Sequence, residues 1–187
     1  MSESVIGALI GIVGTVIGTI LGWLLNNLSN KGKLNLYVSE WNYKFQKQDE
    51  IGGFVDASDF TESKYFHYDL SVDVYNSSGE TKIMRNVKIL FQKKKELIWK
   101  HSPNDDSTRR ISGPMSFYDN VQPINVEPKT VFKIKMHFGL WESDEKFSEL
   151  MDVDRIYLSY VNEYNKEKKV LVAKICFEDF FITRDKT

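Results

Sequence analysis

"FHYDLSVDVYN", residues 66–76, alternates between apolar and polar side chains along its whole length. The apolar members share one face: Phe66, Tyr68, Leu70, Val72 and Val74. The polar members share the other: His67, Asp69, Ser71 and Asp73. Because successive side chains of a β-strand point to opposite faces, this period of two predicts a strand with one side in a hydrophobic core.

The same pattern recurs further along the chain. Residues 76–80, "NSSGE", have turn composition, which explains the glycosylation-type triplet at Asn76. Two later segments alternate again, with these residues expected inward: Val87, Ile89 and Phe91, then Phe132, Ile134, Met136 and Phe138. Outward residues of the second segment are Lys133, Lys135 and His137. Further strands are expected at 34–45, 96–100, 116–126, 155–164, 168–175 and 177–182. Many short strands predict a mainly β fold, an antiparallel β-sandwich of immunoglobulin-like or related barrel type.

One segment of this β-rich part is expected to be helical. In "ESDEKFSELMDV", residues 142–153, Ser143 is suited to be the N-cap, with two acidic residues in the first turn. Phe147, Leu150 and Met151 would then lie on one side. The tryptophans Trp41, Trp99 and Trp141 lie within apolar strand patterns, so we expect them in the core.

A different pattern precedes the strands. No charged residue occurs from Val5 to Leu25, and at about 1.5 Å rise per residue this run covers the roughly 30 Å of a bilayer's hydrocarbon core. The segment before it contains Glu3 and no Lys or Arg, and no small-x-small site follows, which favours an uncleaved anchor over a signal peptide. The expected organisation is a tail at 1–4, a transmembrane helix at 5–28, a hinge at 29–33, a β-sandwich domain at 34–183 and a tail at 184–187.

Lys31 and Lys33 follow the span, and no Lys or Arg precedes it. The positive-inside rule therefore predicts a single-pass protein of the cell membrane with its N-terminus outside and its β-domain in the cytoplasm. The one cysteine, Cys176, excludes an intrachain disulfide and permits a reducing compartment. Its apolar surroundings in the sequence predict a core position.

Glycines are concentrated on one side of the predicted span. At about 100° per residue they fall within an arc of roughly 80°, which Thr15 and Thr19 extend. The glycines are Gly7, Gly11, Gly14, Gly18 and Gly22. A small-residue face permits close helix packing in lipid, so we expect a homo-oligomer formed through this helix. The alternative is that glycine is simply common in membrane helices.

Catalytic and cofactor motifs are not found in the sequence. His67, His101 and His137 lack metal-ligand spacing and are expected to be structural or solvent-exposed. Cys176 has no nucleophile motif, and no glycine-rich phosphate loop follows a strand. The near-balanced charge, −1 at pH 7, does not indicate nucleic-acid binding. We therefore expect a protein that is not an enzyme and uses no cofactor or metal.

Two groups of cations are candidates for contacts to an anionic ligand. Lys93, Lys94 and Lys95 form one group, and Arg109 and Arg110 form the other. Such side chains can bind phosphate or anionic lipid. The alternative is that the lysines guard a strand edge and the arginines lie on a mobile loop.

Residues 70–91, "LSVDVYNSSGETKIMRNVKILF", resemble immunoglobulin-like sandwiches found behind single N-terminal spans in bacterial membrane proteins. The glycine-rich span resembles those of holin-like and phage-defence membrane effectors. This resemblance implies a cytoplasmic sensing domain, which binds a protein partner or small anionic ligand, joined to a helix that acts on the bilayer. Two other functions stay open: a passive anchor for a cytoplasmic complex, and a membrane-bound enzyme with an unrecognised site.

Overall fold

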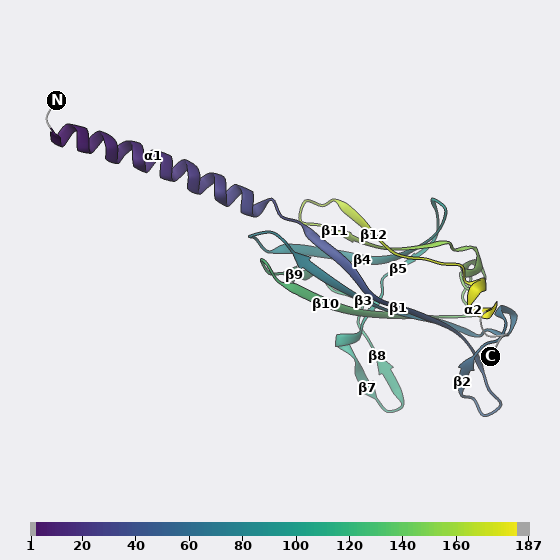
Figure 1. Ribbon diagram of the computed structural model, residues 1–187. Helices are drawn as coiled ribbons and strands as arrows, with labels where there is room; N and C mark the ends of the chain where they lie inside the picture. The colour runs from purple at the N-terminus through teal and green to yellow at the C-terminus, as the bar shows by residue number, and fades with distance from the viewer. Residues whose placement is uncertain (1–2, 183–187) are drawn as a thin grey trace.

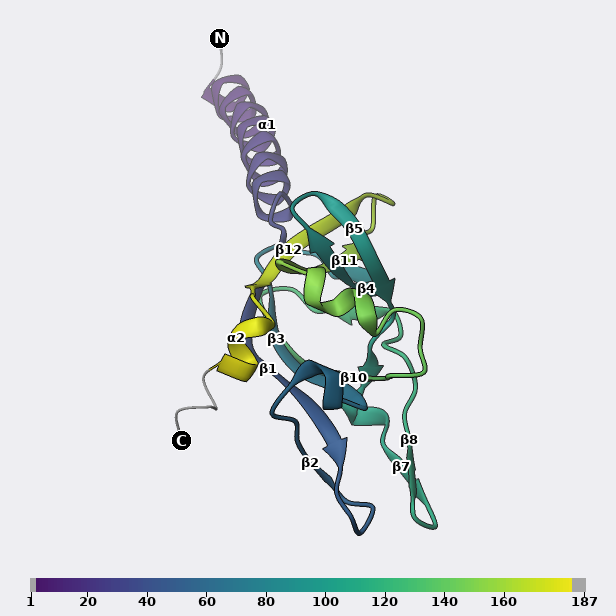
Figure 2. The same ribbon diagram turned by 90° about the vertical axis from the view of Figure 1, so that its right-hand side faces the viewer.

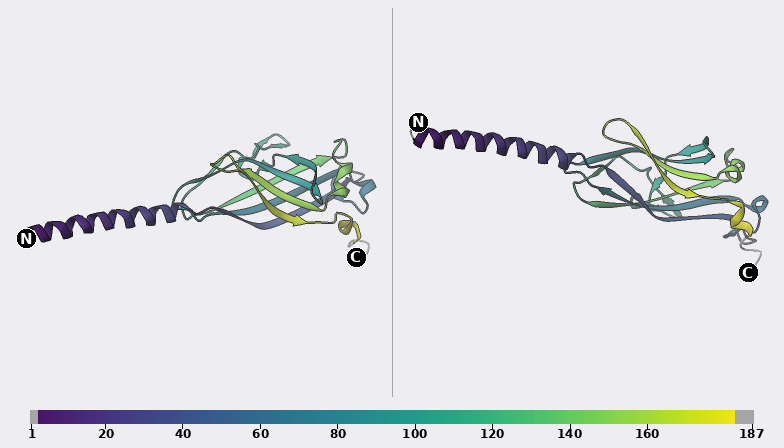
Figure 3. Two further views of the ribbon diagram at one scale, coloured as in Figure 1. Left: turned by 90° about the horizontal axis from the view of Figure 1, so that it is seen from above. Right: turned by 45° about the horizontal axis from the view of Figure 1, so that its top comes forward.

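The computed structural model describes residues 3–182 of the chain. Helix α1 (Glu3–Asn30) extends from one end of a β-domain and continues its long axis, while the short helix α2 (Glu178–Ile182) lies at the other end (Figures 1 and 3). No described residue of α1 is buried. The apolar surface of the helix is therefore left uncovered by its own domain. Residues 1–2 and 183–187, which hold most of the two expected tails, lie outside the described range.

Two antiparallel sheets form the β-domain. The first has the strand order β2-β1-β3-β10-β6. Its strands are β1 (Leu34–Gln48), β2 (Phe54–Asp56), β3 (Tyr65–Asn76), β6 (Asn104–Asp105) and β10 (Val131–Trp141). The second has the order β12-β11-β4-β5, and β9 also pairs with β4. Its strands are β4 (Lys82–Lys93), β5 (Glu96–His101), β9 (Ile124–Val126), β11 (Arg155–Val161) and β12 (Glu167–Lys174). The predicted β-sandwich is confirmed.

Shorter elements connect the strands. They are the 3₁₀ helices η1 (Phe60–Glu62), η2 (Asp106–Thr108) and η3 (Ser148–Asp152), and a separate hairpin of β7 (Arg110–Ser112) and β8 (Met115–Phe117). Figure 2 shows the β7–β8 hairpin and the β1–β2 hairpin projecting to the same side of the domain. The predicted strand at 116–126 is therefore present only at its two ends, in β8 and β9.

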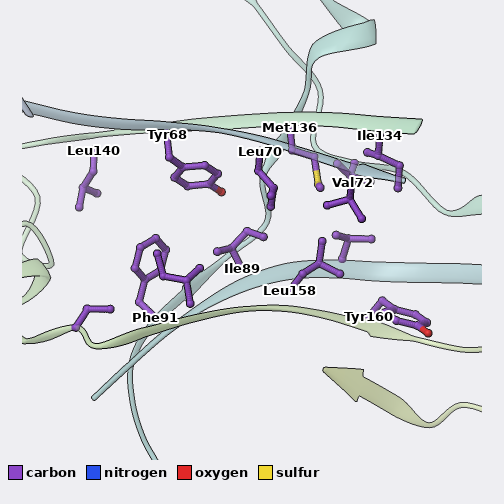
Figure 4. Close-up of a cluster of buried hydrophobic side chains, with 14 of the residues drawn as sticks. Tyr68, Leu70, Val72, Ile89, Phe91, Ile134, Met136, Leu140, Leu158 and Tyr160 are labelled. Atoms are coloured by element: carbon purple, nitrogen blue, oxygen red, sulfur yellow. The ribbon is translucent and has the colours of Figure 1, made fainter. Parts of the chain in front are cut away.

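The strand predicted from residues 66–76 is the centre of the first sheet. It pairs with β1 on one side and β10 on the other, so that Leu70 lies between Trp41 and Met136. All five apolar residues of its inner face are at most 1% exposed. Figure 4 shows Tyr68, Leu70 and Val72 facing side chains of β4 and β11, among them Ile89, Phe91 and Leu158. Burying two such faces against each other is the main source of the domain's stability.

Some residues expected in the core lie outside it. Trp41 and Trp99 pack against the core, but Trp141 is 46% exposed, because it has the outward parity of Lys133 and His137 on β10. Phe132 is 45% exposed at the start of that strand. The inward positions further along, Ile134 and Met136, are buried as predicted.

The helix expected over 142–153 is largely replaced by turns and η3. Ser143 is not its N-cap; instead the Trp141 amide donates a hydrogen bond to Asp144 Oδ2 at 2.9 Å. The reason is the spacing of the buried residues Phe147, Leu150 and Val153, which recur every three positions. A 3₁₀ helix has three residues per turn, so it places all three side chains inward.

The end of the chain also differs from expectation. Residues 177–182, considered as a strand, contain α2, and Phe177 is fully buried while Phe180 and Phe181 pack against the core. Cys176 is exposed, so its predicted core position is wrong. Because β12 ends at Lys174, the chain turns there, and Phe177 instead of Cys176 is buried in the core.

The expected hinge at 29–33 is bonded to the β3–β4 turn. The Gly79 amide donates to the Ser29 carbonyl at 2.9 Å, and the Ser78 hydroxyl donates to the Asn30 carbonyl at 3.3 Å. These bonds satisfy carbonyl groups that the last turn of a helix leaves free. A Cβ at Gly32 would lie 2.3 Å from the Ser77 carbonyl oxygen, so glycine permits this close approach. The turn thus joins helix and domain by direct contact.

Candidate functional site

A cleft of about 780 Å³ opens beside β10, which we call the edge cleft. It is lined by residues 132–135 and 137 of β10, by residues 105–107 and 109 around η2, and by Asp69, Tyr118 and Ile124. In the described residues, β6 pairs only with Met136 and His137, so the first half of β10 has no strand on this side. The cleft therefore combines an open strand edge with charged side chains.

His137 is held at the inner end of the edge cleft. Its Nδ1 atom makes a short ion-pair contact with Asp106 Oδ1, and the Tyr118 ring lies edge-on with its centroid 4.2 Å away. The other ring nitrogen, Nε2, lies 3.5 Å from the Asn104 amide. Within residues 3–182, no hydroxyl or thiol is bonded to this imidazole, so the arrangement lacks the nucleophile–base pair of a hydrolase. Asp106 and Asn104 together fix the orientation of the imidazole.

The cleft can provide cations to an anionic ligand. Arg109, Lys133 and Lys135 line it together with His137. Among the nearby carboxylates, Asp106 contacts His137, and Asp105 accepts a hydrogen bond from the Ser107 amide at 2.9 Å. Arg109 donates to the Ser116 hydroxyl at 3.2 Å, which holds it toward the β7–β8 hairpin.

The candidate cations from the sequence are divided between two places. Arg110 does not line the edge cleft and pairs with Asp119 at 2.7 Å. Lys93, Lys94 and Lys95 lie at the β4–β5 turn, where Lys93 pairs with Asp152. The Lys94 amide donates to the Asp154 carboxylate at 2.9 Å. Of the five residues, Arg109 alone lines the edge cleft.

A second cleft, of about 730 Å³, lies where α1 leaves the domain. Its walls are residues 30–37, residues of β11 and β12, and the loop between those strands. Six lysines line it: Lys31, Lys33, Lys82, Lys166, Lys168 and Lys169. We call it the basic cleft. The sequence reasoning missed it because three separate segments contribute, although "KEKK" at 166–169 is a visible signal.

No packing contact within the described residues requires glycine at the five positions of the α1 glycine face. A Cβ built at Gly7, Gly11, Gly14, Gly18 or Gly22 meets nothing within 4 Å. The Thr15 and Thr19 hydroxyls donate to the carbonyls of Gly11 and Thr15, at 2.9 and 2.8 Å. Their hydroxyl protons are therefore used inside the helix, which leaves the oxygens as acceptors for a neighbouring helix.

His101 belongs to the core and not to either cleft. Its ring is stacked on Trp99, 4.3 Å between centroids, and shares a 2.7 Å hydrogen bond with the Tyr68 hydroxyl. Burial disfavours the charged imidazole and lowers the pKa of His101 to about 3. The prediction that this histidine is structural agrees with its packing. Within the described residues, no group of three or more metal-ligating side chains of suitable arrangement occurs.

This burial predicts that acid destabilises the domain. Between pH 6.5 and pH 3 the unfolded His101 binds a proton that the folded one does not, so stability is complete above pH 6.5 and falls as the pH is lowered. From pH 7.5 to pH 5 we expect His101 to account for about 2 kcal/mol of lost unfolding free energy. Denaturant unfolding of wild type and His101→Gln at both pH values measures this loss. The variant should lack the part of the pH dependence of the unfolding free energy that His101 causes. Parallel curves for wild type and His101→Gln would contradict the assignment.

The fold and its helix define a class of protein: an immunoglobulin-like β-sandwich behind an N-terminal helix that, in the described residues, is long and apolar enough to cross a membrane. The family model of the YopI Ig-like domain matches residues 32–173, and the chain belongs to this family. The immunoglobulin-like sandwich implied by the resemblance in the sequence is thereby confirmed.

The relatives span nearly the whole chain. It is 25% identical over 173 residues to the SPbeta prophage-derived uncharacterized protein YopI of Bacillus subtilis (strain 168), covering 92% of this chain and 93% of that protein. Among solved structures, the ApaA protein from Bordetella pertussis is 10% identical with a TM-score of 0.36, covering 78% of this chain and 93% of that chain. A β-sandwich protein from Clostridium difficile 630 is 12% identical with a TM-score of 0.34, covering 75% and 86%.

Proposed function

We propose that this chain is a single-pass membrane protein, not an enzyme, whose cytoplasmic β-sandwich binds a partner while its helix self-associates. The observation that carries the proposal is α1: 28 residues of mean hydropathy suited to a bilayer, none of them buried by the domain. A helix that is apolar all round and uncovered is stable in lipid and not in water. The domain then lies at the cytoplasmic surface of the membrane.

The binding role rests on the edge cleft. Its open strand edge can pair with an extended segment of a protein partner, and its cations can hold a small anionic ligand. His137 is oriented by Asp106 without an adjacent nucleophile in residues 3–182, which favours recognition over catalysis. Of the five cations that the sequence suggested, we retain Arg109 as a contact to this ligand.

The proposal also includes a specific action on the membrane: the assembled helices perturb the bilayer. The relative YopI is prophage-derived, and a prophage-encoded or defence effector would use ligand binding at the domain to assemble helices. The glycine face of α1 supplies the packing surface that such assembly needs. Coupling would pass through the bonded contact between the β3–β4 turn and the helix end.

The orientation can be tested with the cysteine already present. Cys176 is the one cysteine of the sequence and is exposed on the β-domain. We expect a membrane-impermeant maleimide to leave it unlabelled in intact cells and to label it after permeabilisation, because Lys31 and Lys33 hold the domain inside. Ser4→Cys in a Cys176→Ser background is the matched control and should be labelled in intact cells. Labelling of Cys176 in intact cells would overturn the orientation.

A further inference from the structure

We propose that the basic cleft binds the phosphate-bearing headgroup of an anionic lipid. This inference rests on the proposed membrane anchoring and adds a specific ligand class at a place distinct from the edge cleft. The residues that line the cleft belong to the end of the domain from which α1 emerges, and this end would face the bilayer. Figure 1 shows α1 leaving the domain at that end.

The depth of the cleft matches the headgroup layer. The uncharged apolar run ends at Leu25, and the wall of the cleft begins at Asn30. Five residues of helix span about 7.5 Å, and the polar layer on each side of the hydrocarbon core is about 5–8 Å thick. The first wall residues therefore lie where lipid phosphates are found.

The charge of the cleft is not neutralised by the protein. Glu163 is the acidic residue that lines it, and Lys82 pairs with Glu163 at 2.8 Å. Glu167 lies 3.9 Å from Lys169. The remaining four lysines of the cleft, Lys31, Lys33, Lys166 and Lys168, form no ion pair within residues 3–182. They are available to an anion from outside.

The loop that carries Lys166 and leads into β12, which carries Lys168, is fixed in place. Asn162 Oδ1 accepts hydrogen bonds from the amides of Tyr164 and Lys166, at 3.1 and 2.9 Å. The buried Lys82–Glu163 pair ties the same loop to β4, and the Glu163 hydrogen bond raises the pKa of Lys82. Tyr164 is 67% exposed at the tip, and tyrosine is enriched at membrane interfaces. The backbone that carries Lys166 is thus ordered before any lipid binds.

The test measures lipid binding to the full chain in uncharged detergent micelles by native mass spectrometry. The probes are short-chain phosphatidylglycerol, phosphatidylcholine as the neutral lipid, and glycerol 1-phosphate as a soluble phosphate. Lys166→Gln with Lys168→Gln removes two cations without touching Lys31 and Lys33, which set the orientation. Lys44→Gln with Lys100→Gln is the matched control at exposed sites away from this cleft.

We expect phosphatidylglycerol to bind in preference to phosphatidylcholine, and the cleft variant to lose about 25-fold in affinity at low salt, about fivefold per lysine. The control pair should stay within about twofold of the parent. Equal binding of both lipids, retention of phosphatidylglycerol by the cleft variant, or equally tight binding of glycerol 1-phosphate would each overturn the lipid assignment. This readout needs neither helix self-association nor a particular orientation, so a failure of those parts of the proposed function would be seen separately.

Discussion

Asn76→Ala is expected to lower the unfolding free energy by about 3–4 kcal/mol, because it leaves several buried backbone groups without a partner. The Asn76 side chain is fully buried and its Nδ2 group donates to the carbonyls of Glu80, Val126 and Glu127, at 2.8, 2.9 and 3.1 Å. Its Oδ1 atom accepts from the Ser78 amide at 2.9 Å. One side chain thus joins the β3–β4 turn to the end of β9. For a domain of this size, we expect the midpoint of thermal unfolding to fall by about 10 °C.

Near-ultraviolet circular dichroism of the full chain in detergent follows this transition through the packed tryptophans. Asn125→Ala is the matched control, since Asn125 is the same residue type, exposed on neighbouring β9, and should change stability by no more than about 0.5 kcal/mol. Asn76→Asp should be at least as damaging as Asn76→Ala, because a carboxylate would face three carbonyl oxygens. An Asn76→Ala chain as stable as Asn125→Ala would refute this role.

The strands of the domain follow from local pattern, and the exceptions have local causes. β3 could be placed from residues 66–76 because its apolar face is buried at every position, while its polar face is at least partly exposed at all positions but Ser71. η3 was mistaken for a longer α-helix because its buried residues repeat every three positions. In so short a segment, this spacing cannot be distinguished from the 3.6-residue period of an α-helix. The short strands β6, β7 and β8 have two or three residues each, which is too few for a period to be read.

The candidate sites depend on contacts that no local pattern contains. "NSSG" identifies a turn, yet the bonds from Asn76 to Val126 join residues fifty positions apart. Likewise, Lys31, Lys82 and Lys168 come together because β1, β4 and β12 all begin at the same end of the sandwich. Arg109 was found from its charge, whereas its neighbours Lys133 and His137 appeared as the solvated face of a strand. Sequence reasoning therefore identified charged residues, and the strand order decided which of them converge.

The glycine face of α1 carries the other large expected effect. Gly14→Ile and Gly18→Ile should each reduce helix self-association about tenfold, since losing roughly 1.4 kcal/mol of packing changes an equilibrium by that factor. Apart from the adjoining backbone of α1 itself, no atom of the described residues lies within 4 Å of a Cβ built at either glycine, so the single chain accommodates the larger side chain. Isoleucine also keeps the span hydrophobic, so membrane insertion should persist.

The measurement is oligomer size by chemical crosslinking in native membranes, together with leakage of ions from cells that express the protein. Val16→Ile is the matched control, because it enlarges the opposite side of the helix by one methylene group and should leave crosslinking unchanged. At Gly14 the helix surface is hollowed between Ile10, Val13 and Ile17, which is where a neighbouring backbone could approach closely. A side chain that fills this hollow acts only on a contact with another helix. If both glycine variants crosslink and leak like the parent, the glycines do not mediate helix packing. The helix would then be a monomeric anchor for the domain.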